Sequence, residues 1–268
     1  MKKIFSIFFV LILFLSSCSE YQKLLKSTDA ELKYNKAVEY FDKGDFVRAA
    51  TLFDDISVYY RGTDRSEEIL NYLAQSYIGQ DDYYSAINYF QTYLKSYPKG
   101  KYAEDAKFMI GYCYYKDSPD ARLDQTATNQ AINAFQEFLD MYPESKLVPD
   151  ANRMVDELLN KLAYKYYLNA RLYYNLGNYM GNNYLSAVIT AQNALKKFPS
   201  TSYRDDLSFL ILQSKFAQAE QSVVSKREER YQDTIDEYYS YINEFPDGKY
   251  KKQADKIFND SKKAINIK

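Results

Sequence analysis

The sequence predicts an all-α protein, an α-α superhelix or solenoid built from about five helix pairs. Three observations lead to this prediction. One helical pattern of apolar residues occurs four times along the chain, each copy is stopped by a proline, and helix-breaking residues are few, with 8 glycines and 6 prolines among 268 residues. Self-similarity over tens of residues is typical of a stacked solenoid, and solenoids usually bind other molecules rather than catalyse reactions.

The repeated pattern places apolar side chains on one face of a helix. Each copy starts at an alanine or threonine and continues with apolar residues one, four, seven, eight and eleven positions later. This is the spacing of an amphipathic helix that buries a single stripe. The four copies run from Ala86 to Pro98, from Ala131 to Pro143, from Ala187 to Pro199 and from Thr234 to Pro246.

The proline that closes each copy predicts where the helix ends. Proline lacks an N–H donor and clashes with the preceding turn, so it cannot continue a helix. We therefore expect helix ends near Tyr97, Tyr142, Phe198 and Phe245, each followed by a short polar turn with one apolar residue. A degenerate turn of the same kind lies at residues 60–64, where Arg61 replaces the proline.

The repeats differ in length, and we assign the excess to loops and long helices. Enlarged hairpin loops are predicted at residues 117–128 and 178–183. Long helices are predicted at residues 149–176, with Pro149 in the first turn, and at residues 207–230. A final helix is expected near residues 251–264.

The front of the chain has the pattern of a secretory signal. Lys2 and Lys3 precede an apolar run over residues 4–15, which is too short for an ordinary membrane span. The run ends in Leu15-Ser16-Ser17-Cys18, which resembles the lipobox of bacterial lipoproteins. We therefore predict a signal peptide at residues 1–17 and lipidation of Cys18, the alternative being an ordinary signal with a chance cysteine. Ser19 stands where an aspartate would resemble the inner-membrane retention signal, so we expect attachment to the outer membrane, facing the periplasm.

A short tether is predicted between the anchor and the first repeat. Thr28 and Glu31 have the spacing of a capping box, which places the first helix start near residue 29. The predicted tether, residues 18–28, would reach at most about 35 Å when extended. The solenoid then occupies residues 29–268, with N-terminal repeats at 29–146 and C-terminal repeats at 147–268.

Signals for catalysis, metals and nucleic acid are weak or missing in the sequence. There is no histidine, and Cys113 lies in an apolar stretch that favours a buried, unreactive thiol. We predict no catalytic residue, no metal site and no cofactor. Loss of residues 1–17 removes two lysines and no acid, so the formal net charge falls from −1 to −3, which argues against nucleic acid as a partner.

The small and aromatic residues of the repeats resemble those of the tetratricopeptide repeat. The matching positions in the second unit are Ala74, Tyr77, Tyr83, Ala86, Phe90 and Pro98. Together with the lipobox and the segment at residues 162–171, they resemble the BamD family of lipoproteins, subunits of the outer-membrane β-barrel assembly machinery. The resemblance implies a non-catalytic scaffold. Its N-terminal repeats would receive the C-terminal signals of unfolded outer-membrane proteins, and its C-terminal repeats would contact a BamA-type barrel subunit.

Tetratricopeptide proteins bind peptides in a groove lined by the first helix of each pair, and the resemblance assigns groove positions in this chain. An aromatic and amide surface suits an extended peptide that ends in an aromatic residue. The predicted groove residues are Tyr34, Val38, Phe41, Asn71, Gln75, Phe108, Tyr112 and Tyr115.

Two other functions fit parts of the sequence. A periplasmic coordinator of the Tol-Pal-associated CpoB type uses similar repeats, but it normally lacks a lipobox, so Cys18 argues against it. A glycan-binding outer-membrane lipoprotein would typically carry tryptophans for stacking on sugars, and this chain has none. We therefore expect binding of polypeptides rather than of glycans.

Overall fold

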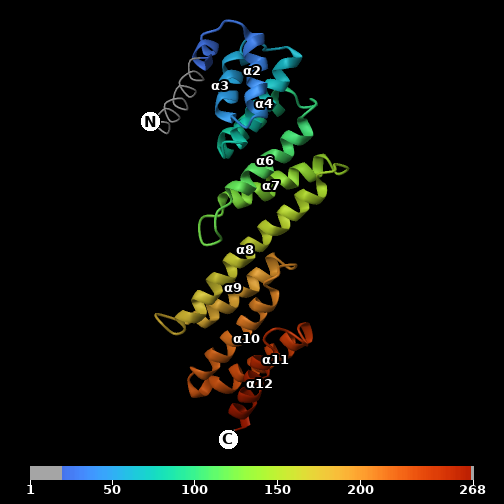
Figure 1. The fold of residues 1–268 in the computed structure, drawn as a ribbon. Helices are drawn as coiled ribbons and strands as arrows, with labels where there is room; N and C mark the ends of the chain where they lie inside the picture. Colours follow the sequence, from blue (N-terminus) through green and yellow to red (C-terminus); the bar gives the residue numbers. More distant parts are fainter. Residues whose placement is uncertain (1–19, 267–268) are drawn as a thin grey trace, which may run out of the picture. The chain divides into compact units, whose positions relative to one another are not determined.

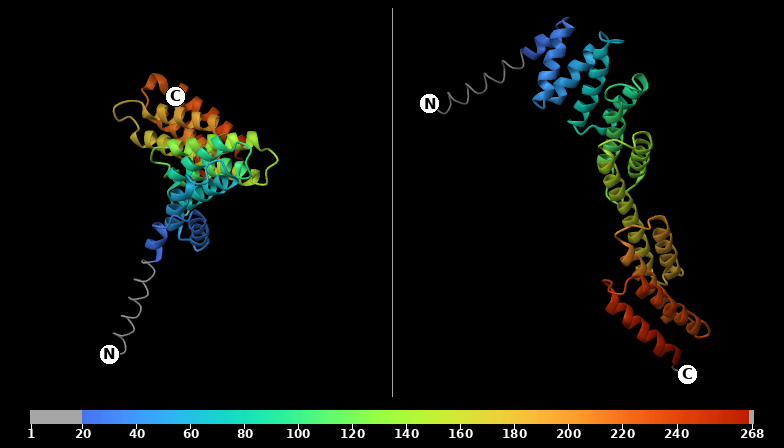
Figure 2. Two further views of the ribbon diagram at one scale, coloured as in Figure 1. Left: turned by 90° about the horizontal axis from the view of Figure 1, so that it is seen from above. Right: turned by 90° about the vertical axis from the view of Figure 1, so that its right-hand side faces the viewer.

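The computed structural model describes residues 20–266, and within this part of the chain it is helical without any strand (Figures 1 and 2). The predicted signal peptide and Cys18 lie outside the described residues. The helices are α2 (Ala30–Asp42), α3 (Phe46–Ser57), α4 (Asp64–Ile78), α5 (Tyr83–Ser96), α6 (Ala103–Asp117), α7 (Thr126–Met141), α8 (Val148–Leu176), α9 (Asn183–Lys197), α10 (Arg204–Glu220), α11 (Val224–Glu244) and α12 (Lys251–Asn266).

From Ala30 to Asn266, the helices follow one another as five pairs and a final single helix, which confirms the predicted all-α class and helix arrangement. The pairs are α2 with α3, α4 with α5, α6 with α7, α8 with α9, and α10 with α11. The chain divides into two compact units. The first extends to Ser118 and includes Asn129–Ala151, whereas the second contains Pro119–Thr128 and the chain from Asn152 onward.

The aromatic residue before each proline ends the second helix of its pair. Helix α5 stops at Ser96, α9 at Lys197 and α11 at Glu244. The following residues share one non-helical conformation, with φ between −133° and −126° and ψ between 65° and 68°. Proline disfavours the helical conformation of the residue before it, so the common dihedral angles follow from the repeated aromatic-proline pair.

The repeated small residues let paired helices approach closely. Ala86, Ala131, Ala187 and Thr234 open the four copies, and all are fully buried. On the first helices, Gly111 is packed so tightly that an added Cβ would lie 2.6 Å from the ring of Phe135. These contacts place the core of each unit between the two helices of a pair and between neighbouring pairs of the same unit.

Most predicted elements are confirmed. Helix α8 is a continuous helix of 29 residues with Pro149 in its first turn, α12 lies where the final helix was expected, and the two enlarged loops fall at residues 118–125 and 177–182. The predicted long helix at residues 207–230 is wrong, because α10 ends at Glu220 and α11 starts at Val224. Ser222 holds this break by donating its hydroxyl to Gln218 O and accepting from the guanidinium of Arg230, both at 2.5 Å.

The described part of the predicted tether is not an extended chain. Residues 20–25, hereafter the N-terminal segment, are helical, and their apolar side chains pack on the first pair. The first cap also differs, because Asp29 rather than Thr28 accepts the hydrogen bond from Leu32 N, at 2.9 Å. The aspartate carboxylate is among the preferred N-cap acceptors, which accounts for the shift by one residue.

Candidate functional site

The first helices of the three pairs in the first unit carry all eight predicted groove residues. Those on α2 face α4 and use much of their surface in packing. The Tyr34 hydroxyl donates to the Glu68 carboxylate at 2.9 Å, and the Phe41 ring meets Tyr72 edge-on at 5.0 Å. Val38 packs on the same core, and all three predicted residues are half-buried. They therefore offer a ring edge or a methyl group, rather than a whole side chain, to a ligand.

An arginine at the start of α4 completes this part of the surface. The guanidinium of Arg65 lies 4.5 Å from the centre of the Tyr34 ring and 5.3 Å from that of Tyr60. It also pairs with Glu31, whose pKa it lowers by hydrogen bonding. Burial, together with the bond to Glu68, raises the pKa of Tyr34. Sequence reasoning did not place Arg65, Glu31 or Glu68 at the groove, because their contacts join residues about one repeat apart.

The polar part of the predicted groove lies on α4 and α6. Asn71 and Gln75 are four residues apart on α4, so they lie on the same face, and both are half-buried. Tyr112 and Tyr115 are three residues apart on α6 and are half-buried as well. Amide groups can bond to the backbone of an extended peptide, and tyrosine rings can stack on its side chains.

Phe108 is not available to a ligand, which corrects the prediction for this residue. Its side chain is 7% exposed, and its ring lies 5.6 Å from Phe135 and 5.5 Å from Phe138, measured between ring centres. The two phenylalanines of α7 cover this position of α6. Phe108 therefore belongs to the core between the helices of the third pair.

A polar side chain on the first helix of each pair binds the turn that closes the same pair, an arrangement we name the turn clamp. Glu67 accepts from Lys101 N, and Asp205 accepts from Lys249 N at 2.9 Å. The corresponding side chains in the other pairs are Glu31, bonded to Tyr60; Glu104, bonded to Ser145; and Asn160, bonded to Thr201 and Ser202.

In two pairs a tyrosine of the second helix joins the turn clamp. The Tyr93 hydroxyl donates to Glu67 and accepts from Tyr102 N at 2.8 Å, and the Tyr241 hydroxyl donates to Asp205 at 2.6 Å. The clamp was missed at the level of sequence. The signal that could have found it in four of the pairs is an acid near the start of the first helix, roughly one repeat before the turn; in the fourth pair the corresponding residue is Asn160, in the middle of α8.

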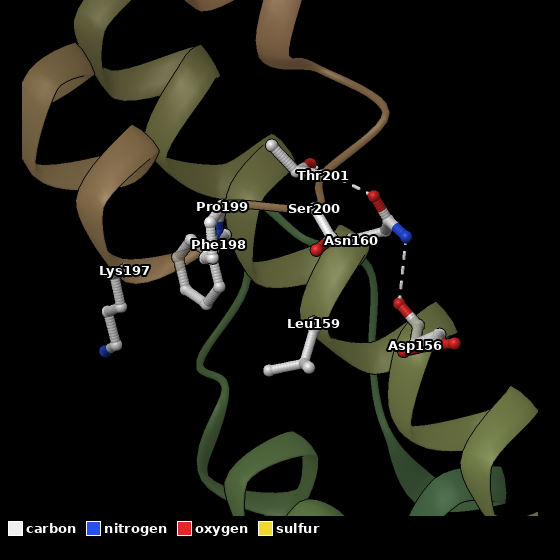
Figure 3. Close-up of a pocket in the computed structure, with 8 residues that line it drawn as sticks. All are labelled: Asp156, Leu159, Asn160, Lys197, Phe198, Pro199, Ser200 and Thr201. Carbon is white, nitrogen blue, oxygen red and sulfur yellow. Dashed lines mark hydrogen bonds between the residues drawn. The ribbon is translucent and has the colours of Figure 1, made fainter.

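The second unit contains a surface hollow of about 310 Å³ beside one such clamp (Figure 3). Leu159 of α8 and Phe198 and Pro199 of the turn give it an apolar wall. Asn160 lies between Thr201 and the backbone of Asp156, and it bonds to both (Figure 3). Asn160 and Thr201 at the rim thus hold the turn, which favours a structural role for this hollow.

Large apolar side chains are exposed on α8 and α9 of the second unit. Leu172 and Leu176 are one turn apart near the end of α8, and Leu185 and Ile189 are one turn apart on α9. Met180, in the loop between the helices, is 89% exposed and has a φ of 55°. Exposed apolar area is a common feature of surfaces that bind other macromolecules.

Other kinds of site have little basis in the described residues. Cys113 is buried, and burial raises the pKa of its thiol to about 12, so the reactive thiolate is suppressed. Between residues 20 and 266, no three acidic, cysteine or histidine side chains are grouped as a metal ion would require. None of the described helices has the length and apolar character needed to cross a membrane.

Comparisons with known proteins agree on one family. Residues 26–180 match the YfiO family, described as "Outer membrane lipoprotein". The chain is also 31% identical over 243 residues to the putative outer membrane protein assembly factor BamD of Aquifex aeolicus (strain VF5). The aligned region covers 90% of this chain and 77% of the relative.

Two solved structures of tetratricopeptide proteins are more distant. The TPR2AB-domain:pHSP90-complex of yeast Sti1 has a TM-score of 0.42 at 14% identity and covers 87% of this chain and 98% of that one. The TPR domain of P58(IPK) has a TM-score of 0.40 at 16% identity, and the match covers 94% of this chain and 67% of that one.

Proposed function

The chain belongs to the YfiO family of outer membrane lipoproteins, and on that basis we propose that it is a scaffold subunit of the machinery that assembles outer-membrane β-barrel proteins. It acts by holding other polypeptides and not by catalysis. The observation that carries the proposal is the 31% identity to an assembly factor over 90% of the chain, a match that extends across both units.

We assign substrate binding to the first unit. Its α4 and α6 present the amides of Asn71 and Gln75 and the rings of Tyr112 and Tyr115, all half-buried. Such a surface suits the C-terminal signal of an unfolded outer-membrane protein, because amides bond to its backbone while aromatic rings pack against its terminal side chain.

We assign the contact with the barrel subunit of the machinery to the second unit. The exposed side chains of Leu172, Leu176, Leu185 and Ile189 provide apolar area that a periplasmic domain of a BamA-type protein can cover. Burial of apolar area is the main source of stability in most protein–protein contacts.

We place the anchor at Cys18, where acylation would fix the chain to the outer membrane with its helices in the periplasm. Purification from detergent-solubilised outer membranes, using a tag at the C-terminus, tests the assignment. We expect to recover a large β-barrel protein with periplasmic repeats. Recovery of Tol-Pal components, or of a TonB-dependent transporter, in its place would contradict the proposal.

Replacement of Tyr112 and Tyr115 by alanine tests the substrate surface. We expect weaker binding of barrel-signal peptides, by about tenfold if each lost ring contact contributes about 0.5–1.5 kcal/mol. Binding is measured by fluorescence anisotropy of a labelled peptide, and helicity by circular dichroism. Tyr84→Ala is the control, because Tyr84 is 78% exposed and lies on α5, a second helix of a pair.

The outcome separates a binding surface from the core. Weaker binding with unchanged melting temperature supports the assignment. A collapse of thermal stability would show that the two rings serve packing. An equal loss of peptide binding in the Tyr84→Ala control would show that the effect is not specific to the first helices.

A further inference from the structure

The N-terminal segment is docked on the first helix pair by aromatic contacts. Its place in the ribbon is at the blue end of the chain (Figure 1). The ring of Tyr21 meets that of Tyr40 edge-on, with 5.8 Å between their centres. The guanidinium of Arg48 lies 5.1 Å from the Tyr21 ring and 5.5 Å from the Tyr40 ring. Leu24 and Leu25 add apolar contacts to the same core. The segment thus touches both α2 and α3.

A buried lysine fixes the other end of the segment. Lys33 of α2 is 6% exposed, and its amine donates to the backbone carbonyl of Leu25 at 3.0 Å and to the carboxylate of Asp55 at 2.5 Å. The last carbonyls of a helix have no partner within the helix, so this bond satisfies one of them. Because an unpaired buried ammonium is unfavourable, Lys33 holds the segment and α3 together.

These contacts define the direction of the N-terminal segment. Tyr21 lies beside Tyr40, near the end of α2, and Leu25 lies beside Lys33, near its start. The segment therefore runs antiparallel to α2, and its first residues lie at the turn between α2 and α3. Cys18 precedes Tyr21 by three residues, a distance of at most about 10 Å even when the chain is fully extended.

We propose that the N-terminal segment is a rigid strut between the lipid anchor and the first helix pair, which holds the turn between α2 and α3 against the phospholipid headgroups. The inference rests on the acylation of Cys18 in the proposed function. With the anchor in the bilayer, the short reach leaves this end of the first pair at the membrane surface. The opposite end of α3 is directed away from it.

The charges at this end indicate that the anchor, and not anionic lipid, provides the attachment. Glu39 pairs with both Lys36 and Lys43, and Arg48 pairs with Asp45. Side chains of opposite sign thus neutralise one another within the surface. We therefore expect a membrane contact that does not depend on negatively charged headgroups.

Fluorophores at exposed positions at the two ends of α3 test the strut. Val47 is 61% exposed and lies beside Arg48, and Val58 is 65% exposed at the other end of the helix, about 16 Å away. Each is replaced by cysteine in the acylated full chain and labelled. Cys113 is buried with a raised thiol pKa of about 12, so it stays unlabelled. The probe is a phosphatidylcholine vesicle that carries a spin label on its headgroups.

We expect fluorescence quenching to be several-fold stronger at Val47→Cys than at Val58→Cys. This ratio should be the same in vesicles with and without anionic lipid. A short Gly-Ser insertion between Ser19 and Glu20 should reduce the difference between the two labels, because it lengthens the chain between anchor and strut. Equal quenching at both positions in a chain that floats with the vesicles would overturn the strut. A chain that does not float, with Cys18 unmodified by mass spectrometry, would instead contradict the proposed anchor itself.

Discussion

At the scale of single residues, the close approach of α6 and α7 depends on the absence of one side chain. Gly111 is buried in α6, and the ring of Phe135 occupies the space where a Cβ would be. Phe135 is fully buried and also contacts Phe108, so it has little room to move. Glycine is unfavourable in a helix interior by about 1 kcal/mol relative to alanine, and here the packing of Phe135 offsets that cost.

We expect Gly111→Ala to destabilise the first unit. Overpacking a core costs about 1–3 kcal/mol. Replacing glycine by alanine in a helix gains about 1 kcal/mol of helix propensity, so we expect the overpacking cost to be the larger of the two here. Chemical denaturation measures the loss. Phe135→Leu should destabilise the parent protein but cost much less in the Gly111→Ala variant, because the smaller side chain gives the new methyl group space. Additive effects of the two substitutions would show that Phe135 adjusts without strain.

At the scale of elements, the turn clamp sets how a pair closes. In the fifth pair, Asp205 at the start of α10 accepts from the Tyr241 hydroxyl of α11 at 2.6 Å and from Lys249 N at 2.9 Å. One carboxylate thus joins the first helix, the second helix and the turn that leads to α12. Tyr241 is 2% exposed, so loss of Asp205 would leave the proton of a shielded hydroxyl without this acceptor.

We expect Asp205→Ala to lower the free energy of unfolding by about 1–3 kcal/mol, and Asp205→Asn to lower it less because one oxygen acceptor remains. Hydrogen exchange of the Lys249 amide provides a local measurement and should become faster in the alanine variant. Asp233→Ala on α11 is the control, since Asp233 is exposed and such substitutions usually change stability by less than about 0.5 kcal/mol. Unchanged protection of Lys249 would show that the clamp contributes nothing to the turn.

The elements also show which features of a sequence predict structure. The aromatic-proline ends of α5, α9 and α11 were predictable because proline acts on the residue directly before it. The break between α10 and α11 was not, because Gln221 and Ser222 are neither glycine nor proline. Gln221 instead accepts from Asn178 at 2.6 Å and donates to the Tyr184 hydroxyl at 2.8 Å, which are contacts that sequence does not display.

For the predicted groove residues, the structure shows only exposure, and exposure was predictable only where position within a repeat fixes it. Asn71, Gln75, Tyr112 and Tyr115 retain partial exposure, whereas Phe108 is covered by α7. The N-terminal segment was not predicted because its helix depends on tertiary contacts. A helix of six residues is not stable alone, and this one is held by contacts such as that of Lys33 with Leu25.

At the scale of the whole molecule, tyrosine is the most frequent aromatic residue, with 30 tyrosines and no tryptophan among 268 residues. Burial raises the pKa of many of them, and bonds to carboxylates add to this effect in several cases. Burial and the bond to Asp255 raise the pKa of Tyr238 to about 12. Raised pKa values are found in both units, at Tyr34, Tyr89, Tyr93, Tyr174, Tyr231 and Tyr241 among others.

These shifts predict unfolding at alkaline pH. A tyrosine whose folded pKa exceeds its unfolded value of about 10 holds its proton more tightly in the folded state. Its contribution to stability is therefore complete below about pH 10 and is lost as the pH rises toward the folded pKa, near 12 for Tyr238. Ultraviolet absorbance of tyrosinate follows ionisation without interference from tryptophan, and circular dichroism follows helicity. We expect one absorbance step from surface tyrosines with helices intact and a second, larger step that coincides with loss of helicity. Complete ionisation near pH 10 in a fully helical protein would contradict the role of tyrosine burial in stabilising each unit.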